Sequence, residues 1–378
     1  MSLHRTFRAP GRVNLIGEHT DYNDGFVMPA AINFSTRITL HPLNDRRLEI
    51  FSQNFTDEAV IDLDNPPNEA RGDWSDYPIG VAVMLMRAGH KLKGGRFVIN
   101  GEVPIGSGLS SSAALEVATA IAITANSDLR IERAELAKIC RQAENEFVGA
   151  HVGIMDQFVS LFGEADKALL LDCRSLAFRL LPLSNKTQLV ICNTMVKHEL
   201  ASSAYNERRA QCEEGVARLN AVIPGVKALR DVSFKQLEQH KDVLPPIIYK
   251  RCRHIVTENG RVLAAAEALE KSDLLRFGRL MNESHQSLRD DYEVSCAELD
   301  SMVELARKCK GVYGARMTGG GFGGCTVNLV ERDHVDEFKS NVASGYEQMT
   351  GLKPEIYVCN AVKGAEEIMQ DTAGKTQV

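Results

Sequence analysis

Pro104-Ile-Gly-Ser-Gly-Leu-Ser-Ser-Ser-Ala113 is a glycine-serine stretch that opens onto an apolar helical run from Ala114 to Ala125. Gly106 and Gly108 allow the backbone to curl closely around an anion, and the serines that follow place hydroxyls where a helix leaves its first N–H groups unpaired. A phosphate group fits this arrangement. An ordinary N-capped helix after a glycine turn fits it equally well, because serine is a favoured N-cap whatever the function.

The sequence around this loop predicts a mixed α and β architecture. Residues 96–104 have a strand pattern, so that strand, loop and helix follow one another, and earlier strands are expected at 26–32, 35–40, 48–52 and 59–63. The second half instead has long amphipathic helical patterns at 199–219, 246–269 and 273–284. Two buried strand patterns flank residues 179–185, which predicts domains 1–182 and 183–378, with room for the last ~20 residues to pack on the first domain.

Composition narrows the class of protein. The 378 residues are 44% hydrophobic and 25% charged with a net charge of -6, which suits a globular chain and does not favour a nucleic-acid surface. Nine cysteines without a C-x-x-C pair indicate reduced thiols and do not favour a zinc site. No signal core and no apolar run of ~18 residues is present, so we expect a cytoplasmic protein without a membrane span.

In a second informative stretch, residues 7–22, Arg12, Glu18, His19 and Asp21 bring four ionisable side chains into a short segment broken by glycines. A solvated loop is the ordinary interpretation of such a segment. The mixture of carboxylates, imidazole and hydroxyls, however, can donate to and accept from the polar rim of a sugar. Binding a polyol requires such groups to converge in one concave place.

Two further acids lie in predicted helices. Glu144 is near the end of a helical pattern and would ordinarily be an exposed helix acid; if it faced the glycine-serine loop, it would suit a hydrated Mg²⁺. Asp156 is flanked by apolar residues, where an unpaired charge is costly. We therefore interpret Asp156 as a functional group in preference to a helix cap.

Three aromatic residues have an ordinary structural interpretation. Trp74 and Tyr77, just before a helical pattern, can pack as a staple on that helix or form a platform for a nucleobase. Tyr205, among serines and an arginine, can be an ordinary residue of an amphipathic helix. The glycine-rich run 316–325 formally contains G-x-G-x-x-G, but a strand follows it, which excludes the dinucleotide-binding interpretation.

Three stretches in order resemble the motifs of the GHMP small-molecule kinases: residues 11–21, 106–112 and 318–324. The first resembles the galactokinase signature in particular. The resemblance continues through residues 153–157, 200–205 and 287–295, so it covers nearly the whole chain. It implies an α+β, two-domain architecture, with the active site between an N-terminal mixed-sheet α/β domain and a C-terminal α+β domain.

The resemblance also implies roles for individual residues in an ATP-dependent phosphorylation of galactose at the anomeric hydroxyl, the first step of the Leloir pathway. Asp156 and Arg12 would be catalytic, and Ser112 and Glu144 would bind Mg²⁺. The sugar would contact Glu18, His19, Thr20, Asp21, Gly153, Asp156 and Tyr205. ATP would contact Trp74, Tyr77, Gly106, Ser107, Gly108, Leu109, Ser110, Ser111 and Ser112.

These roles are chemically consistent. Phosphoryl transfer needs an aligned hydroxyl, a cation near the transferring group and a shielded metal. Asp156 would accept or orient the hydroxyl proton, while Arg12 would keep that carboxylate ionised. Since neither a Walker lysine nor a protein-kinase catalytic loop is present, helix amides, Mg²⁺ and Arg12 would carry the electrostatics.

The resemblance leaves some questions open. His151-Val152 stands where the family often has Pro-Cys, and we expect His151 to lie on the surface. A kinase for N-acetylgalactosamine or another pyranose, and a galactose- and ATP-binding sensor without turnover, are the competing functions. Galactose and ATP are the expected partners, with no nucleic acid and no membrane, and the chain is expected to be a monomer or a weak homodimer.

Overall fold

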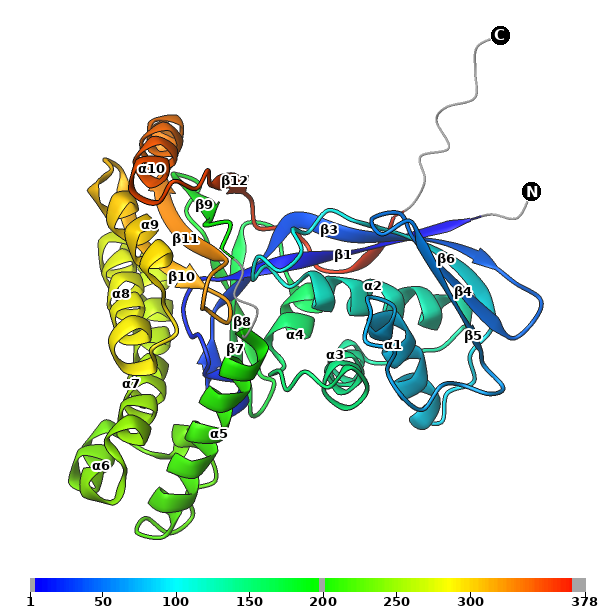
Figure 1. Ribbon diagram of the computed structural model, residues 1–378, viewed down its shortest axis with the longest axis horizontal. Coiled ribbons are helices and arrows are strands. Elements are labelled where there is room, and N and C mark those ends of the chain that lie inside the picture. Colours follow the sequence, from blue (N-terminus) through cyan, green and yellow to red (C-terminus); the bar gives the residue numbers. More distant parts are fainter. Residues whose placement is uncertain (1–3, 197–200, 369–378) are drawn as a thin grey trace.

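The computed structural model describes residues 4–196 and 201–368. Elements of the first half gather at one end of an elongated molecule, and the helices of the second half form the other end (Figure 1). The predicted start of a helix at Glu199 lies outside the described residues, and the helix is described from Ala201 onward. Within the described ranges, no helix combines the length and apolar character needed to cross a bilayer.

The first half is built on a sheet of order β13-β1-β3-β6-β4-β5, antiparallel except where β4 pairs with β6. Its strands are β1 Arg5–Asn14, β3 Pro29–Pro42, β4 Arg47–Ser52, β5 Asp57–Asp62, β6 Gly95–Gly101 and β13 Glu366–Ile368. Helix α2, Ser111–Asn126, packs along β1 and β3 and is buried on most sides by the other helices of this half (Figure 1). These are α1 Asp76–Arg87, α3 Arg133–Gln142 and α4 Met155–Phe162.

Two smaller sheets connect this half to the helical end. One has the order β2-β7-β8, with β2 Phe26–Val27, β7 Lys167–Asp172 and β8 Phe178–Pro182. The other has the order β10-β11-β9-β12, with β9 Thr187–Asn193, β10 Val312–Thr318, β11 Cys325–Glu331 and β12 Glu355–Cys359. All seven residues of β9 are buried, as expected for a central strand covered on both faces.

Helices cover the second half. They are α5 Ala201–Asn220, α6 Phe234–Gln239, α7 Pro246–Glu270, α8 Leu274–Ser287, α9 Ala297–Lys308 and α10 Val335–Thr350. One buried apolar cluster contains Val13 and Ile16 from the first half together with Val262 and Cys325 from the second. The two halves therefore share a core. The division at residues 182 and 183, which falls between β8 and β9, stays a prediction, and β13 returns from the chain's end to pair with β1.

Candidate active site

A cavity of about 490 Å³ lies where the two halves meet. It is lined by side chains or backbone from five segments: the first motif, the glycine-serine loop, α4, α5 and the glycine run. Of the predicted site residues, the lining includes Arg12, Glu18, His19, Asp21, Trp74, Tyr77, Gly106, Gly108, Ser110, Ser111, Ser112, Glu144, Gly153, Asp156 and Tyr205. Segments distant in sequence are thus brought together in one concave place, as ligand binding requires.

Three predicted residues do not line this cavity: Thr20, Ser107 and Leu109. The Thr20 hydroxyl donates to the backbone oxygens of Gly17 and Phe26, so it braces its own turn. The Ser107 hydroxyl donates to the Pro104 oxygen at 2.7 Å, and Leu109 is fully buried. For these three residues, the side chains stabilise loops and do not reach the cavity.

Arg12 and Asp156 form the central pair of the site. Arg12 lies in β1, and Asp156 lies in the first turn of α4. Arg12 donates from Nε to Oδ1 and from Nη2 to Oδ2 of Asp156, both at 2.9 Å, and from Nη1 to the Gly108 oxygen at 2.6 Å. The Ser110 hydroxyl also donates to Asp156 Oδ2. A fixed carboxylate and a buried guanidinium therefore stand beside the glycine-serine loop.

The loop leaves the start of α2 open to an anion. Ser110 occupies the N-cap position, with its backbone in the left-handed region at φ 61°. Its side chain accepts no capping hydrogen bond from the described amides of α2. Its hydroxyl is engaged by Asp156 instead. Gly106 and Gly108 also have positive φ values, 71° and 80°. The simple N-capped helix is therefore the weaker interpretation, because the helix amides lack the serine oxygen that would occupy them.

A group of acids surrounds Ser112. Glu144 is 6% exposed, so it is not the surface acid that helix statistics would suggest. Burial, and then the charge of Asp156, raises the pKa of Glu144 to about 7, while a hydrogen bond from Ser112 lowers it. Gln157 Nε2 donates to Glu144 Oε2 at 2.7 Å and to Glu116 Oε2 at 3.0 Å. A cation placed here would offset this concentration of carboxyl groups.

The donor set fits Mg²⁺ held jointly with phosphates. In the described part of the chain, no group of three or more His, Cys, Asp or Glu side chains is arranged to hold a metal ion. Ser112 and Glu144 offer one hydroxyl and one carboxylate, which are oxygen ligands of the kind Mg²⁺ takes. Since Mg²⁺ usually keeps few protein ligands and fills its octahedron with water and phosphate oxygens, two ligands are sufficient.

Polar groups at the other end of the cavity suit a polyol. His19 has a left-handed backbone at φ 65°, and its Nδ1 lies 2.8 Å from the Tyr22 hydroxyl. Burial lowers the pKa of His19 to about 3, so the ring is neutral at pH 7. Burial, and then the charge of Asp156, raises the pKa of Asp21 to about 7. A Cβ on Gly153 would come within 1.9 Å of Asp21 Oδ2, so this position requires glycine.

Trp74 and Tyr77 line the cavity, and Trp74 lies next to β5. Trp74 donates from Nε1 to Asp57 Oδ2 at 3.0 Å and is stacked against Phe55, with ring centroids 5.8 Å apart and planes 13° apart. Tyr77 begins α1 next to the acidic cluster, and burial raises its pKa to about 12. Both rings contribute to the cavity wall and to the packing of α1.

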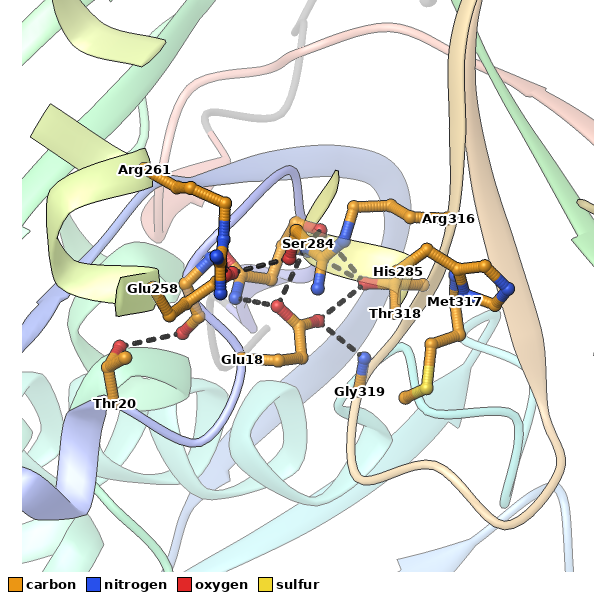
Figure 2. A network of polar contacts seen from close by, with 12 residues as sticks. Glu18, Thr20, Glu258, Arg261, Ser284, His285, Arg316, Met317, Thr318 and Gly319 are labelled. Carbon is orange, nitrogen blue, oxygen red and sulfur yellow. Dashed lines mark hydrogen bonds and ion pairs between the residues drawn. The ribbon is translucent and has the colours of Figure 1, made fainter. Parts of the chain in front are cut away.

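Sequence reasoning missed two buried charges beside the cavity. Arg316 is fully buried in β10 and donates from Nη1 to Glu18 Oε2 at 2.9 Å, as Figure 2 shows. Glu116 in α2 is fully buried next to Glu144. A signal was available for Glu116: its helix is apolar on nearly every face, so a residue at that position has no solvent to face.

Family models match three parts of the chain. "GHMP kinases N terminal domain" matches residues 76–164, "Galactokinase galactose-binding signature" matches residues 2–42, and "GHMP kinases C terminal" matches residues 265–348. Together they cover the glycine-serine loop, the first motif and the glycine run.

Curated relatives and solved structures agree with these matches. A galactokinase of Roseiflexus sp. is 48% identical over 97% of this chain and 94% of its own, and one of Fusobacterium nucleatum is 45% identical over 96% and 94%. The crystal structure of Lactococcus lactis galactokinase complexed with galactose matches with a TM-score of 0.94, 39% identity and coverage of 97% and 95%. Methanococcus jannaschii mevalonate kinase shares the fold at 18% identity and a TM-score of 0.65. The predicted α+β architecture is confirmed.

Proposed function

Because the chain belongs to the galactokinases of the GHMP kinase family, we propose that it transfers the γ-phosphoryl group of ATP to the anomeric hydroxyl of galactose, giving galactose 1-phosphate and ADP. The observation that carries this proposal is the two-point ion pair between Arg12 and Asp156 beside the glycine-serine loop. It places an acceptor for a hydroxyl proton and a cation next to the start of α2.

The pair divides the work of transfer between its members. Asp156 accepts the hydrogen bond of the anomeric hydroxyl, aligns its oxygen and receives its proton. Arg12 orients that carboxylate through two hydrogen bonds and offsets negative charge on the reacting oxygens. Ser110 donates to the same carboxylate from the loop, so the position of Asp156 depends on the loop that holds the phosphates.

The start of α2 and the acidic cluster bind the nucleotide end. Backbone amides from Gly106 to Ser112 wrap the phosphates at the helix N-terminus. Ser112 and Glu144 would hold Mg²⁺, which would supply charge neutralisation when bound. Trp74 and Tyr77, which line the cavity, border the adenine.

The sugar lies between these groups and the second half. Glu18, His19, Asp21 and Tyr205 line this end of the cavity, and Gly153 leaves the space that Asp21 occupies. Neutral His19 contacts the Tyr22 hydroxyl through Nδ1 and therefore has its Nε2 left for the sugar, whereas the carboxylates accept from hydroxyls. Converging acceptors of this kind suit a pyranose with several free hydroxyls.

A coupled assay for ADP release tests the proposal with galactose, N-acetylgalactosamine, glucose and arabinose as separate acceptors. Turnover with galactose at the greatest kcat/KM is the expected result. Turnover that is faster with N-acetylgalactosamine would reassign the substrate. Calorimetric binding of galactose without any ADP release would make the chain a sensor and would overturn the enzymatic function.

We further propose a cytoplasmic protein that acts as a monomer or a weak homodimer. All nine cysteines are free thiols, which suits a reducing compartment. Residues of one chain, from both halves, line the cavity, which suits an enzyme that acts as a single copy. Sedimentation of the purified protein at micromolar concentration tests the oligomeric state.

A further inference from the structure

A buried guanidinium stands behind the sugar end of the cavity. Arg316 is fully buried in β10, and its Nη1 donates to Glu18 Oε2 at 2.9 Å and to the Asn14 oxygen at 3.4 Å (Figure 2). Its Nε and Nη2 are also buried, without a hydrogen-bond partner among the described residues. Burying a charged group whose N–H donors are unpaired costs free energy, and an apolar side chain of similar volume would avoid that cost. Stability alone therefore does not account for an arginine here.

The Glu18 carboxylate is held almost completely by protein donors. Oε2 accepts from Arg316 and from Asn14 Nδ2, and Oε1 accepts from the Gly319 amide at 2.8 Å. The Thr318 hydroxyl lies 3.2 Å from Oε1 and 3.0 Å from the Asn14 oxygen, and it has one proton to give. Because a carboxylate accepts about four hydrogen bonds, Glu18 keeps room for one ligand hydroxyl on the cavity side.

The backbone of the same motif is fixed separately, from α7. The Gly17 amide donates to Glu258 Oε1 at 2.9 Å, and His254 Nε2 lies 3.1 Å from the Glu18 oxygen. Glu258 is in turn paired with Arg261 Nε at 2.6 Å (Figure 2). The main chain at Gly17 and Glu18 is therefore held from α7, whereas Arg316 donates to the Glu18 side chain and, at 3.4 Å, to the Asn14 backbone oxygen.

We propose that Arg316 is a positioning residue for the sugar: it holds the Glu18 carboxylate ionised and oriented so that one acceptor position faces a galactose hydroxyl. This inference rests on the proposed function. It assigns Arg316, the first residue of the glycine-rich run 316–325, to the sugar end of the cavity, whereas Gly319 of the same run lies against Gly108 of the glycine-serine loop. Arg316 thus acts on galactose through Glu18 and does not touch the sugar itself.

Ionisation of Glu18 is the electrostatic part of this role. Burial raises the pKa of Glu18, and the charge of Arg316 is the largest opposing influence. The other ionisable groups around Glu18 and Arg316 are Arg12 from β1, His19 and Asp21 from the following turn, His254, Glu258 and Arg261 from α7, and His285 from α8. Burial lowers the pKa values of all three histidines, so they add no charge near pH 7. Removing Arg316 leaves only Arg12 to offset the Glu18 charge, and the carboxyl will stay protonated to higher pH.

The test compares Arg316→Met, Arg316→Lys and a matched control, Arg261→Met. Arg261 belongs to the same buried cluster and makes the same kind of ion pair, but its partner is Glu258. For each purified variant, KM and kcat for galactose, KM for ATP and calorimetric galactose binding are measured between pH 6 and pH 9, together with the melting temperature.

Arg316→Met is expected to raise the KM and Kd for galactose about 10- to 100-fold near pH 7, the usual loss for a charge-assisted hydrogen bond. The KM for ATP should change less than about threefold, and the galactose defect should shrink as pH rises and Glu18 ionises. Arg316→Lys should recover most of the galactose affinity. Arg261→Met should lower the melting temperature while keeping the galactose KM within about twofold of the wild type.

Three outcomes would overturn the proposal. They are a galactose KM in Arg316→Met that stays within about twofold of wild type, a defect of equal size for galactose and ATP that does not vary with pH, or the same galactose defect in Arg261→Met. If Arg316→Met does not fold, Arg316→Lys decides the matter through its galactose KM and its pH profile. Failure of the wild type to phosphorylate galactose would instead contradict the proposed function, so the two failures are distinguishable.

Discussion

Arg12 and Asp156 are 144 positions apart in the chain and are joined by two parallel hydrogen bonds of 2.9 Å each. A guanidinium and a carboxylate that are joined by two hydrogen bonds attract each other electrostatically and fix each other's orientation. The side chain of Arg12 is 6% exposed and that of Asp156 is 24% exposed, so solvent reaches the acid and hardly reaches its partner. A reactant that enters the cavity therefore meets the carboxylate, with the cation held behind it.

Asp156→Asn should abolish most turnover while retaining sugar binding. The amide keeps the shape of the side chain but cannot take a proton, and loss of a positioned base costs about 10²- to 10⁴-fold in rate. We expect kcat to fall by that factor, with the calorimetric Kd for galactose within about fivefold of wild type. ADP release measures the first quantity. A kcat within tenfold of wild type would remove Asp156 from the proton-accepting role.

Ser112→Ala should raise the concentration of Mg²⁺ required for half-maximal activity. The substitution removes one of two protein oxygens proposed to hold the ion, and changes around a metal site typically cost about 10- to 100-fold in affinity. Activity at saturating ATP is measured against free Mg²⁺. Thr119→Ala, which removes a hydroxyl from the same helix at a residue outside the cavity, is the control. An unchanged Mg²⁺ dependence in Ser112→Ala would exclude Ser112 from the metal shell.

Nucleotide binding should be visible through Trp74, because the chain has a single tryptophan and it lines the cavity. We expect ADP or an unreactive ATP analogue to change the fluorescence of Trp74, since a base packed near the indole alters its environment. Galactose alone should leave the signal unchanged. Trp74→Phe should lose the signal and raise the KM for ATP several-fold. Fluorescence that responds to galactose and ignores nucleotide would place the adenine elsewhere.

Some of this architecture follows from sequence patterns alone. The loop 104–113 between a strand pattern and an apolar run predicted β6, the turn and α2, because local periodicity and glycine placement act within a few residues. The predicted strand 26–32 is divided in the structure into β2 and the start of β3, since a two-residue pairing with β7 ends at Val27. Boundaries of this kind depend on partners that periodicity does not reveal.

Residues of the candidate site could be predicted from the sequence only where they belong to a recognisable motif. The meeting of Arg12 with Asp156 was expected from the resemblance, whereas the pair of Glu18 with Arg316, separated by 298 positions, was not. Arg316 looks like an ordinary charged residue in sequence, because burial is decided by the sheet β10-β11-β9-β12 packing against the first motif. Long-range ion pairs carry no periodic signal, so their detection required the three-dimensional structure.

Asp21→Asn is expected to stabilise the ligand-free protein at high pH. The folded pKa of Asp21 is raised to about 7 from an ordinary value of 3.8, first by burial and then by the charge of Asp156. Folding therefore takes up a proton between those two values, and the stability that is present below pH ~4 is lost as pH rises through ~7. Asparagine has no proton to lose. Because Asp21 is partly exposed, the gain at pH 8 should be only about 1–2 kcal/mol.

Urea unfolding at pH 5 and pH 8, without ligand, measures this effect as the difference between wild type and Asp21→Asn. Asp24→Asn is the control, since Asp24 lies in the same turn but is paired with Arg174 on the surface. Glu144 makes the same contribution to the pH dependence of the unfolding free energy in both proteins, so its contribution cancels in the difference. We expect Asp21→Asn to gain stability and to lose galactose binding. The ionised carboxylate destabilises the protein when the cavity is empty, but it is also the group that accepts hydrogen bonds from the sugar. An equal difference at both pH values would show that Asp21 does not titrate between them.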